Sequence, residues 1–154
     1  MPGSADALVL FGATGDLCHR KIFPSLYQLV RRGRLTVPVV GVARAGWNRD
    51  QLVARFRDSM KSFVPGAEEA VIARFVSLLQ YVDGDYNDAA TFSTMKALLG
   101  GARAPLHYFA IPPSMFAVVV GQLAASGADQ GARVVVEKPF GRDFASAHQL
   151  NLTL

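Results

Sequence analysis

The sequence predicts an α/β fold in which helices cover both faces of a mainly parallel, doubly wound sheet. Four short apolar runs are continuous rather than alternating, which is typical of strands that are buried on both faces. These runs are Ala7–Gly12, Val37–Ala43, Leu106–Ile111 and Ala132–Glu137. Segments with helical spacing lie between them, and strands that alternate with helices through short connections form parallel sheets.

A fifth strand and several helices complete the expected order of elements. Leu79–Asp83 is a weaker strand candidate. Apolar residues at helical spacing indicate helices over Ile22–Val30, Leu52–Phe63 and Phe116–Leu123. Pro24 lies inside the first of these patterns, so we expect a bend or an irregular turn there. Another helix is expected to begin at Phe144.

Composition limits the class of protein. Of the 154 residues, 51% are apolar and 18% are charged, which suits one folded domain and excludes a disordered chain. Cys18 is the only cysteine, so no disulfide can form within the chain, and we expect a cytoplasmic location. The first residues do not resemble a signal peptide, and no apolar run approaches the roughly 20 residues of a membrane helix.

The chain has a net charge of +4, and part of this charge is concentrated at Arg31, Arg32 and Arg34. These cations lie where the first helix should end, and positive charge there offsets the helix dipole. We therefore expect neither a nucleic acid nor a membrane as a partner.

A glycine-rich turn, GATGDLC from Gly12 to Cys18, follows the first strand and leads directly into a helix. Such a turn lets backbone amides approach the pyrophosphate of a dinucleotide, which then faces the positive end of the helix. Gly12 permits the tight turn, Gly15 permits the close approach, and the small Cys18 lets the helix pack near the strand. The spacing departs from GxGxxG, so the position of the turn after the first buried strand supports the prediction.

The end of the second strand indicates which dinucleotide binds. NAD sites usually carry Asp or Glu there, hydrogen-bonded to the ribose hydroxyls. Here the residue is Arg44, and a guanidinium can pair with a 2′-phosphate through two hydrogen bonds. The sequence therefore favours NADP as the cofactor, although a solvated surface arginine is the simpler alternative.

Two further turns are expected at the same edge of the sheet. Lys138 and Pro139 follow the last strand, where a rigidly held lysine could reach a sugar hydroxyl or a phosphate, or could simply be exposed. Ile111 and Pro112 end the preceding strand, and they either border the nicotinamide or only begin a helix. The helix start is the favoured interpretation.

Together these segments resemble the glucose-6-phosphate dehydrogenase family. The matching stretches follow the family's order and cover nearly the whole chain: LVLFGATGDLCHRKIFPSLYQL, VPVVGVAR, YVDGDYND, LHYFAIPPSMF and VVVEKPFGRDFASAHQLN. The resemblance implies the NADP-binding Rossmann domain of an oxidoreductase in the pentose phosphate pathway. Such an enzyme oxidises D-glucose 6-phosphate to 6-phospho-D-glucono-1,5-lactone with NADP⁺.

The resemblance also implies roles for particular residues. Arg44 would hold the adenosine 2′-phosphate, Lys138 would contact both glucose 6-phosphate and the coenzyme, and Lys21 is a weaker site candidate. No metal site is implied. The implied coenzyme-binding residues are Gly12, Ala13, Thr14, Gly15, Asp16, Leu17, Arg44, Ile111, Pro112, Lys138 and Pro139.

Much of the implied enzyme would lie outside this chain, which looks truncated. Residues 1–143 would form the NADP-binding domain, and residues 144–154 would begin a helix leading to a second β+α domain for substrate binding and dimerisation. The family's catalytic base is a histidine of that domain, and His19, His107 and His148 do not match it. We therefore expect these histidines to be structural or solvated, and the chain alone to be nearly inactive. An uncovered sheet edge should also make it form homo-oligomers.

Three alternatives remain open. A sugar oxidoreductase of the glucose–fructose oxidoreductase type would also carry an EKP turn, but it usually shows GxGxxG. A short-chain reductase would need a tyrosine followed by a lysine four residues later, and the sequence has no such pair. A non-catalytic NADP-binding or regulatory domain would carry the same binding loop.

Overall fold

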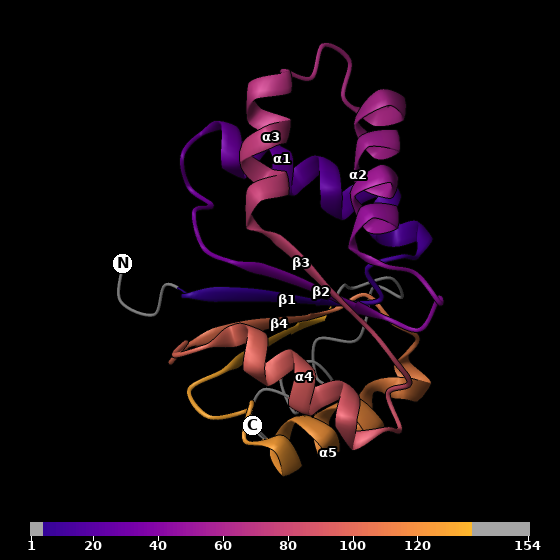
Figure 1. Cartoon of the computed structure of the whole chain (residues 1–154), viewed down its shortest axis with the longest axis vertical. Coiled ribbons are helices and arrows are strands. Elements are labelled where there is room, and N and C mark those ends of the chain that lie inside the picture. The colour runs from indigo at the N-terminus through magenta and orange to yellow at the C-terminus, as the bar shows by residue number, and fades with distance from the viewer. Residues whose placement is uncertain (1–4, 137–154) are drawn as a thin grey trace.

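The computed structural model describes residues 5–136, which form one five-stranded parallel sheet flanked by helices (Figure 1). The strands are β1 (Ala7–Phe11), β2 (Val39–Ala43), β3 (Leu79–Asp83), β4 (Pro105–Phe109) and β5 (Arg133–Val136). Their spatial order is β3-β2-β1-β4-β5, and every neighbouring pair is parallel. This order has the reversal of winding direction beside β1 that defines a doubly wound Rossmann sheet. The predicted fold class is confirmed.

Helices cover both faces of the sheet. In Figure 1, α1, α2 and α3 lie on one side, and α4 and α5 lie on the other. Right-handed crossovers produce this division, because the chain winds outward from β1 in one direction and then in the opposite direction. The helical segments are η1, a π-helical turn (Cys18–Ile22), α1 (Phe23–Arg31), α2 (Arg49–Phe63), α3 (Glu69–Leu78), α4 (Ala89–Leu99), η2, a 3-10 turn (Pro113–Met115), and α5 (Phe116–Ser126).

The side chains of β1 alternate between the two layers of the core. Leu8 and Leu10 pack in the cluster beneath α1, α2 and α3, whereas Val9 and Phe11 pack in the cluster beneath α4 and α5. Aromatic rings fill both layers, and the closest pair, Phe56 with Phe75, has ring centroids 4.3 Å apart. All five residues of β1 are buried, which explains why this strand appears in the sequence as a continuous apolar run.

All five predicted strands are present, but four of them are shorter than their apolar runs. Gly12 turns out of the first run with a φ of +85°. Pro38 has no N–H to donate to the ladder, and β2 begins only at the following residue. Pro112 has no N–H to donate to a ladder, and β4 ends three residues before it. The weakest candidate, Leu79–Asp83, matches β3 at both ends.

The three predicted helices of residues 5–136 are also present, and the irregular turn expected around Pro24 is confirmed. The chain makes the π-helical turn η1 first, and Pro24 then occupies the first turn of α1, where its missing N–H needs no partner. Two residues assigned to buried helix faces are more open than expected, since Leu29 is 36% exposed and Phe63 is 41% exposed. Helices α3 and α4 were not predicted.

Within residues 5–136, no helix is both long enough and apolar enough to cross a membrane. The helix expected from Phe144 lies outside the described residues.

Candidate nucleotide-binding site

The predicted site residues gather at the carboxyl edge of the sheet. Gly12 follows β1, Arg44 follows β2 and Ile111 lies two residues after β4. Gly12 and Ile111 are neighbours, because a Cβ placed on Gly12 would lie 3.1 Å from Cγ2 of Ile111. The crevice at the switch in winding direction, between β1 and β4, is where ligands bind in sheets of this class.

The backbone at Gly12 has no room for any other residue. Its φ is +85°, and an added Cβ would overlap the carbonyl oxygen of Ala110 at the end of β4. The Gly12 amide donates to the Val42 carbonyl oxygen at 2.9 Å and to the Tyr86 hydroxyl oxygen at 2.8 Å. The Gly15 amide donates to the Gly12 carbonyl oxygen at 3.0 Å and closes the turn. The predicted tight turn at Gly12 is therefore confirmed.

The other residues of the glycine-rich turn have different surroundings. Ala13 is fully buried, and its amide donates to the Val42 carbonyl oxygen at 3.3 Å. Gly15 and Asp16 are exposed, and a Cβ on Gly15 would meet only the Gly12 carbonyl oxygen at an ordinary 3.4 Å. The contacts within the described residues therefore do not require glycine at position 15.

Cys18 packs the helical segment against the sheet, as its position in the motif predicted. It is fully buried in the core cluster beneath α1. Burial raises the pKa of its thiol to about 12, so the thiol is neutral and serves packing rather than chemistry. The helical segment from η1 through α1 thus begins beside the glycine turn, with its positive end at the carboxyl edge.

Arg55 of α2 adds a positive charge that was not predicted from the sequence. Its Nη2 lies 3.7 Å from Oδ1 of Asp16, whose side chain is 84% exposed. Its Nε is buried and has no hydrogen-bond partner among the described residues. An ion pair at this distance with one exposed partner contributes little stability, so the main effect of Arg55 is the cation that it places beside the turn.

Arg44 is at the predicted place, but it has a carboxylate partner. Its Nη1 lies 3.1 Å from Oδ2 of Asp85, and the two side chains are 74% and 37% exposed. The loop that carries Arg44 is held by Asp83, whose Oδ1 accepts hydrogen bonds from the amides of Ala45, Gly46 and Trp47. Although burial acts in the opposite direction, hydrogen bonds from Tyr81 and these amides hold the pKa of Asp83 below its ordinary value.

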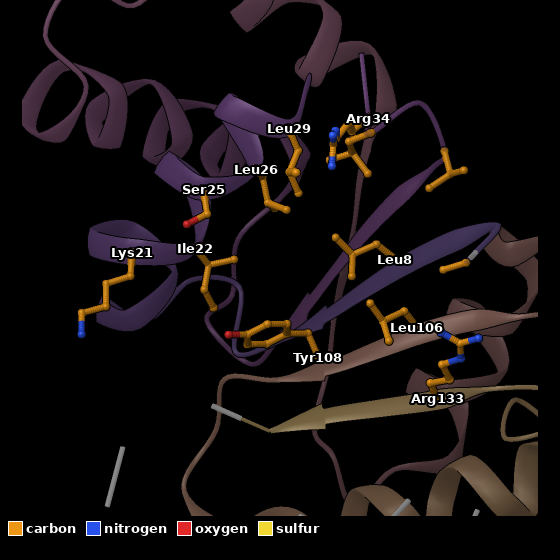
Figure 2. A pocket seen from close by; sticks show the side chains of 13 residues that line it. Leu8, Lys21, Ile22, Ser25, Leu26, Leu29, Arg34, Leu106, Tyr108 and Arg133 are labelled. Carbon is orange, nitrogen blue, oxygen red and sulfur yellow. The ribbon is translucent and has the colours of Figure 1, made fainter. Parts of the chain in front are cut away.

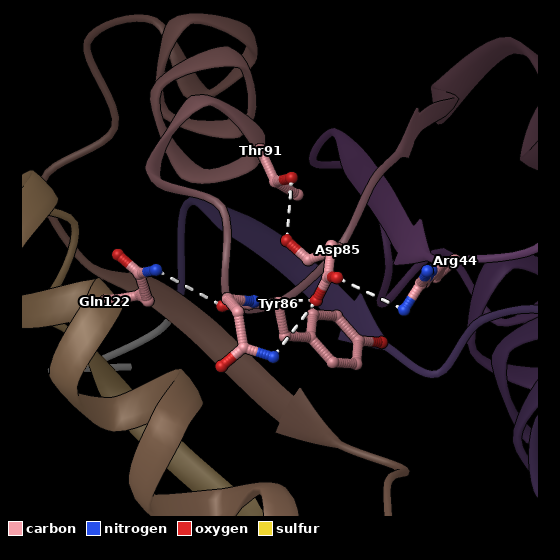
Figure 3. A network of polar contacts seen from close by, with 6 residues as sticks. Arg44, Asp85, Tyr86, Thr91 and Gln122 are labelled. Atoms are coloured by element: carbon pink, nitrogen blue, oxygen red, sulfur yellow. Dashed lines mark hydrogen bonds and ion pairs between the residues drawn. The ribbon is translucent and has the colours of Figure 1, made fainter.

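Tyr86, which lies in the loop after β3 (Figure 3), contacts the glycine turn through its hydroxyl. Its hydroxyl accepts the Gly12 amide and donates to the Val42 carbonyl oxygen at 3.2 Å, so it ties the ends of β1 and β2 together. Its backbone carbonyl accepts a hydrogen bond from Nε2 of Gln122 on α5 at 3.3 Å. Burial raises the pKa of the phenol to about 12, which keeps it protonated and able to donate.

Tyr86, Asp83 and Asp85 were not predicted to contact the site. All three lie in the stretch YVDGDYND, which resembles the family. A run of acidic and aromatic residues directly after a strand was the available signal, because the carboxyl ends of parallel strands carry the binding loops.

Ile111 and Pro112 form a helix start. Pro112 is the N-cap of η2, its carbonyl accepts the Met115 amide at 2.9 Å, and α5 follows at once. The predicted helix start is therefore confirmed. Lys138 and Pro139 lie outside the described residues.

Lys21 is exposed on η1, where it lines a small hollow beside Asp16 and Leu17 of the glycine turn. It also lines a second hollow of about 670 Å³ between α1 and the sheet (Figure 2). The apolar lining of this second hollow includes Leu8, Ile22, Leu26, Leu29, Leu106 and Tyr108. The second hollow lies over the face of β1 and β4, so it is separate from the site at the carboxyl edge.

The two described histidines make structural contacts, as expected. Nε2 of His19 lies 2.7 Å from Oδ2 of Asp58. His107 is fully buried in β4 with its Nε2 2.9 Å from the Ala128 carbonyl oxygen, and burial lowers its pKa. Among residues 5–136, no group of three or more His, Cys, Asp or Glu side chains is placed to hold a metal ion. His148 lies outside these residues.

These features fit a dinucleotide. Gly12 brings the backbone close to the end of β4, the positive end of a helical segment stands beside it, and a cationic side chain follows β2. A pyrophosphate needs the first two features, and a phosphorylated ribose needs the third.

Comparisons with known proteins agree with this assignment. The family model for the NAD binding domain of glucose-6-phosphate dehydrogenase matches residues 9–154. Glucose-6-phosphate 1-dehydrogenase 1 of Mycobacterium tuberculosis is 41% identical over 152 residues, which are 99% of this chain and 32% of that protein. The chain thus spans about a third of its relative's length.

Two solved structures of the same family share the fold. The crystal structure of glucose-6-phosphate 1-dehydrogenase from Mycobacterium avium has a TM-score of 0.85 and 41% identity, over 98% of this chain and 34% of that one. A glucose-6-phosphate dehydrogenase in complex with its substrate glucose-6-phosphate has a TM-score of 0.76 and 30% identity, with the same coverage of both chains. With its Rossmann sheet, glycine turn and matching family model, this chain belongs to the glucose-6-phosphate dehydrogenase family and corresponds to its nucleotide-binding domain.

Proposed function

We propose that the chain binds NADP, with the pyrophosphate at Gly12–Leu17 and the adenosine 2′-phosphate at Arg44. The observation that carries this proposal is the mostly exposed guanidinium directly after β2, at the same sheet edge as the Gly12 turn. A guanidinium pairs with phosphate through two hydrogen bonds. Ile111 and Pro112 would border the nicotinamide, and Lys138 and Pro139 would complete the cofactor site.

We further propose that the full-length protein oxidises D-glucose 6-phosphate to 6-phospho-D-glucono-1,5-lactone and passes the hydride from C1 to NADP⁺. Support comes from the relatives, which are named glucose-6-phosphate 1-dehydrogenases. In this proposal residues 1–143 form the cofactor domain, residues 144–154 lead into a second domain that completes a homo-oligomeric enzyme, and Lys138 contacts the sugar phosphate. We infer a cytoplasmic location, consistent with a single cysteine that is buried and free.

This chain alone should have almost no dehydrogenase activity. When hydride leaves C1, a base must take the hydroxyl proton, and such a base commonly contributes about 10²- to 10⁴-fold in rate. The described histidines are engaged elsewhere, since His19 pairs with Asp58 and His107 is buried in the sheet. Mixing the purified chain with glucose 6-phosphate and NADP⁺ and following NADPH absorbance tests this point. Robust turnover would show that a base within the chain had been overlooked.

Thermal melts test nucleotide binding directly. At about one hundred times its dissociation constant, a ligand stabilises the fold by roughly 2.7 kcal/mol. For a domain of this size, the melting temperature rises by about 2–4 °C per kcal/mol. We expect NADP⁺ to raise the melting temperature by several degrees and NAD⁺ to raise it much less.

Arg44→Ala and Arg31→Ala form a matched pair for this experiment. Arg31 is an exposed arginine at the far end of α1, where its Nε donates to Oε1 of Gln28 at 3.0 Å. Arg44→Ala should remove most of the difference between the two nucleotides, and Arg31→Ala should preserve it. If neither nucleotide moves the melt of the unaltered chain, the binding proposal is wrong.

We also infer that the isolated chain self-associates through exposed apolar residues of β5 and α1. Among residues 5–136, β5 is an edge strand whose Val135 is 37% exposed, and Leu29, which lines the hollow between α1 and the sheet, is 36% exposed. Exposed apolar surface next to an unpaired strand edge promotes association. Light scattering should show a mass that rises with concentration, and a constant monomer mass up to high concentration would contradict the inference.

A further inference from the structure

A cation and a carboxylate meet where the NADP ribose is expected to bind. In the β2–β3 ladder Ala43 is paired with Asp83, and the Gly84 amide donates to the Ala43 carbonyl oxygen at 2.9 Å. Arg44 follows Ala43, and Asp85 follows Gly84. The register of the ladder therefore brings these two side chains together, and Nη1 of Arg44 lies 3.1 Å from Oδ2 of Asp85.

Asp85 is the fixed member of this pair. Its Oδ1 accepts hydrogen bonds from the Asn87 amide at 2.9 Å and from Asn87 Nδ2 at 3.2 Å, and its backbone carbonyl accepts the Thr91 hydroxyl at 2.9 Å (Figure 3). The hydrogen bonds from Asn87, and to a smaller degree the nearby Arg44, lower the pKa of the carboxyl group, so it is ionised at neutral pH. Arg44 is 74% exposed and can move its guanidinium more freely.

The arrangement differs from both usual ribose sites. In NAD sites the acidic residue at the end of the second strand accepts the ribose hydroxyl, and in NADP sites an arginine accommodates the 2′-phosphate. Here the second strand supplies the arginine and the third strand supplies a carboxylate beside it. A 2′-phosphate carries more than one negative charge. It must therefore compete for Arg44 with the Asp85 carboxylate, which the loop holds in place.

We propose that Asp85 is a specificity-determining residue that weakens the preference of Arg44 for a 2′-phosphate and offers an acceptor to the 2′-hydroxyl of NAD. The proposal rests on the proposed NADP function of the same site. The Arg44–Asp85 pair, rather than Arg44 alone, would then discriminate between NADP⁺ and NAD⁺. NAD⁺ should therefore bind at a measurable level.

The test is the affinity of Asp85→Asn for NADP⁺ and NAD⁺, measured by titration calorimetry on this chain. The amide keeps an oxygen that can accept the Asn87 hydrogen bonds but removes the charge. We expect NADP⁺ to bind about 3- to 10-fold more tightly, the size expected when one charge near an exposed ion pair is removed. NAD⁺ should not bind more tightly. The gain for NADP⁺ should shrink at high salt, because exposed charges are screened.

Two further variants keep the experiment decisive. Asp129→Asn makes the same change in the loop before β5, at the amino edge of the sheet, and should leave the ratio of the two affinities unaltered. Asp85→Ser, whose hydroxyl can also accept the Asn87 amide, replaces Asp85→Asn if circular dichroism shows that the latter is unfolded.

The outcomes separate this proposal from the function on which it rests. If the unaltered chain binds NADP⁺ but Asp85→Asn binds it equally or more weakly, the specificity role is overturned and the NADP function stands. If the unaltered chain binds neither nucleotide, both are overturned. Tighter NADP⁺ binding together with unchanged or weaker NAD⁺ binding supports the proposal.

Discussion

Replacing Gly12 by alanine tests how closely the glycine turn is fitted to the sheet. Gly12 has a φ of +85°, and its added Cβ would overlap the Ala110 carbonyl oxygen, stand 2.8 Å from the Ala110 carbonyl carbon and lie 3.1 Å from Ile111 Cγ2. Two of these three contacts are with backbone, which cannot rotate away as a side chain can. The Ala110 amide also donates to the Phe11 carbonyl oxygen at 2.9 Å, so the end of β4 is tied to β1.

The expected loss of stability has three parts. A left-handed backbone costs an alanine about 1–2 kcal/mol. Forcing atoms into a packed site costs about 1–3 kcal/mol, and loosening the Ala110–Phe11 hydrogen bond costs about 1 kcal/mol. Gly12→Ala should therefore lose roughly 3–6 kcal/mol, which lowers the melting temperature by about 6–24 °C in a domain of this size.

Gly33→Ala is the control that separates the cost of a left-handed backbone from the cost of the overlap between Cβ and Ala110. Gly33 has a φ of +72°, but a Cβ there would meet nothing within 4 Å. Only the backbone cost of about 1–2 kcal/mol should apply, so its melting temperature should fall by a few degrees.

The assay is thermal unfolding followed by circular dichroism, with and without NADP⁺. We expect Gly12→Ala to melt well below Gly33→Ala and to lose the shift caused by NADP⁺, which Gly33→Ala should retain. If the two variants melted together and both responded to NADP⁺, the turn would be looser than its contacts indicate, and the reasoning from close approach would be refuted.

Three more predictions concern side chains around the site and the sheet. Tyr86→Phe should destabilise the fold by only about 0.5–1.5 kcal/mol, because the Gly12 amide keeps its hydrogen bond to Val42. Calorimetry should show that this variant binds NADP⁺ and NAD⁺ more weakly to the same degree, and an effect on one nucleotide only would contradict this. Burial lowers the pKa of His107 in the folded state, so the unfolded state binds a proton at a higher pH. The free energy of unfolding, measured in urea, should therefore fall as the pH drops below about 6.5. His107→Gln should flatten this dependence of the unfolding free energy on pH. Asp83→Asn should lose about 1–3 kcal/mol in thermal melts, because three backbone amides lose a charged acceptor; an unchanged melt would show that these bonds contribute little.

The sequence predicted the sheet well because its central strands are buried on both faces. β1 and β2 are buried along their whole lengths, so they stand out as continuous apolar runs. Strand ends were predicted less well, because single residues such as Gly12 and Pro112 ended the ladder inside or beside an apolar run. Helix α4 did have a readable signal, since Asp88 caps it and Phe92, Met95 and Leu99 recur at helical spacing on its buried face.

Some residues of the site could be predicted from local sequence, and others could not. A local motif marked the glycine turn and Arg44, because each follows directly from the end of an apolar strand. The bond from Gly12 to the Tyr86 hydroxyl spans 74 residues, and the Asp83 carboxylate holds amides more than 35 residues away in sequence. Contacts of this kind depend on which strands become neighbours, and the order β3-β2-β1 is not visible in the spacing of residues along the chain.

The third strand therefore has more influence on the nucleotide site than its weak sequence pattern indicated. Its carboxyl end supplies the carboxylate that holds the loop of Arg44, the carboxylate that pairs with Arg44, and the hydroxyl that binds the amide of the glycine turn. The usual rule infers cofactor preference from the residue at the end of the second strand. In a parallel ladder, however, the neighbouring strand ends at the same edge and in a fixed register, so its next residues lie within reach of the same ribose. In our proposal, the cofactor preference of this chain therefore depends on Arg44 and Asp85 together.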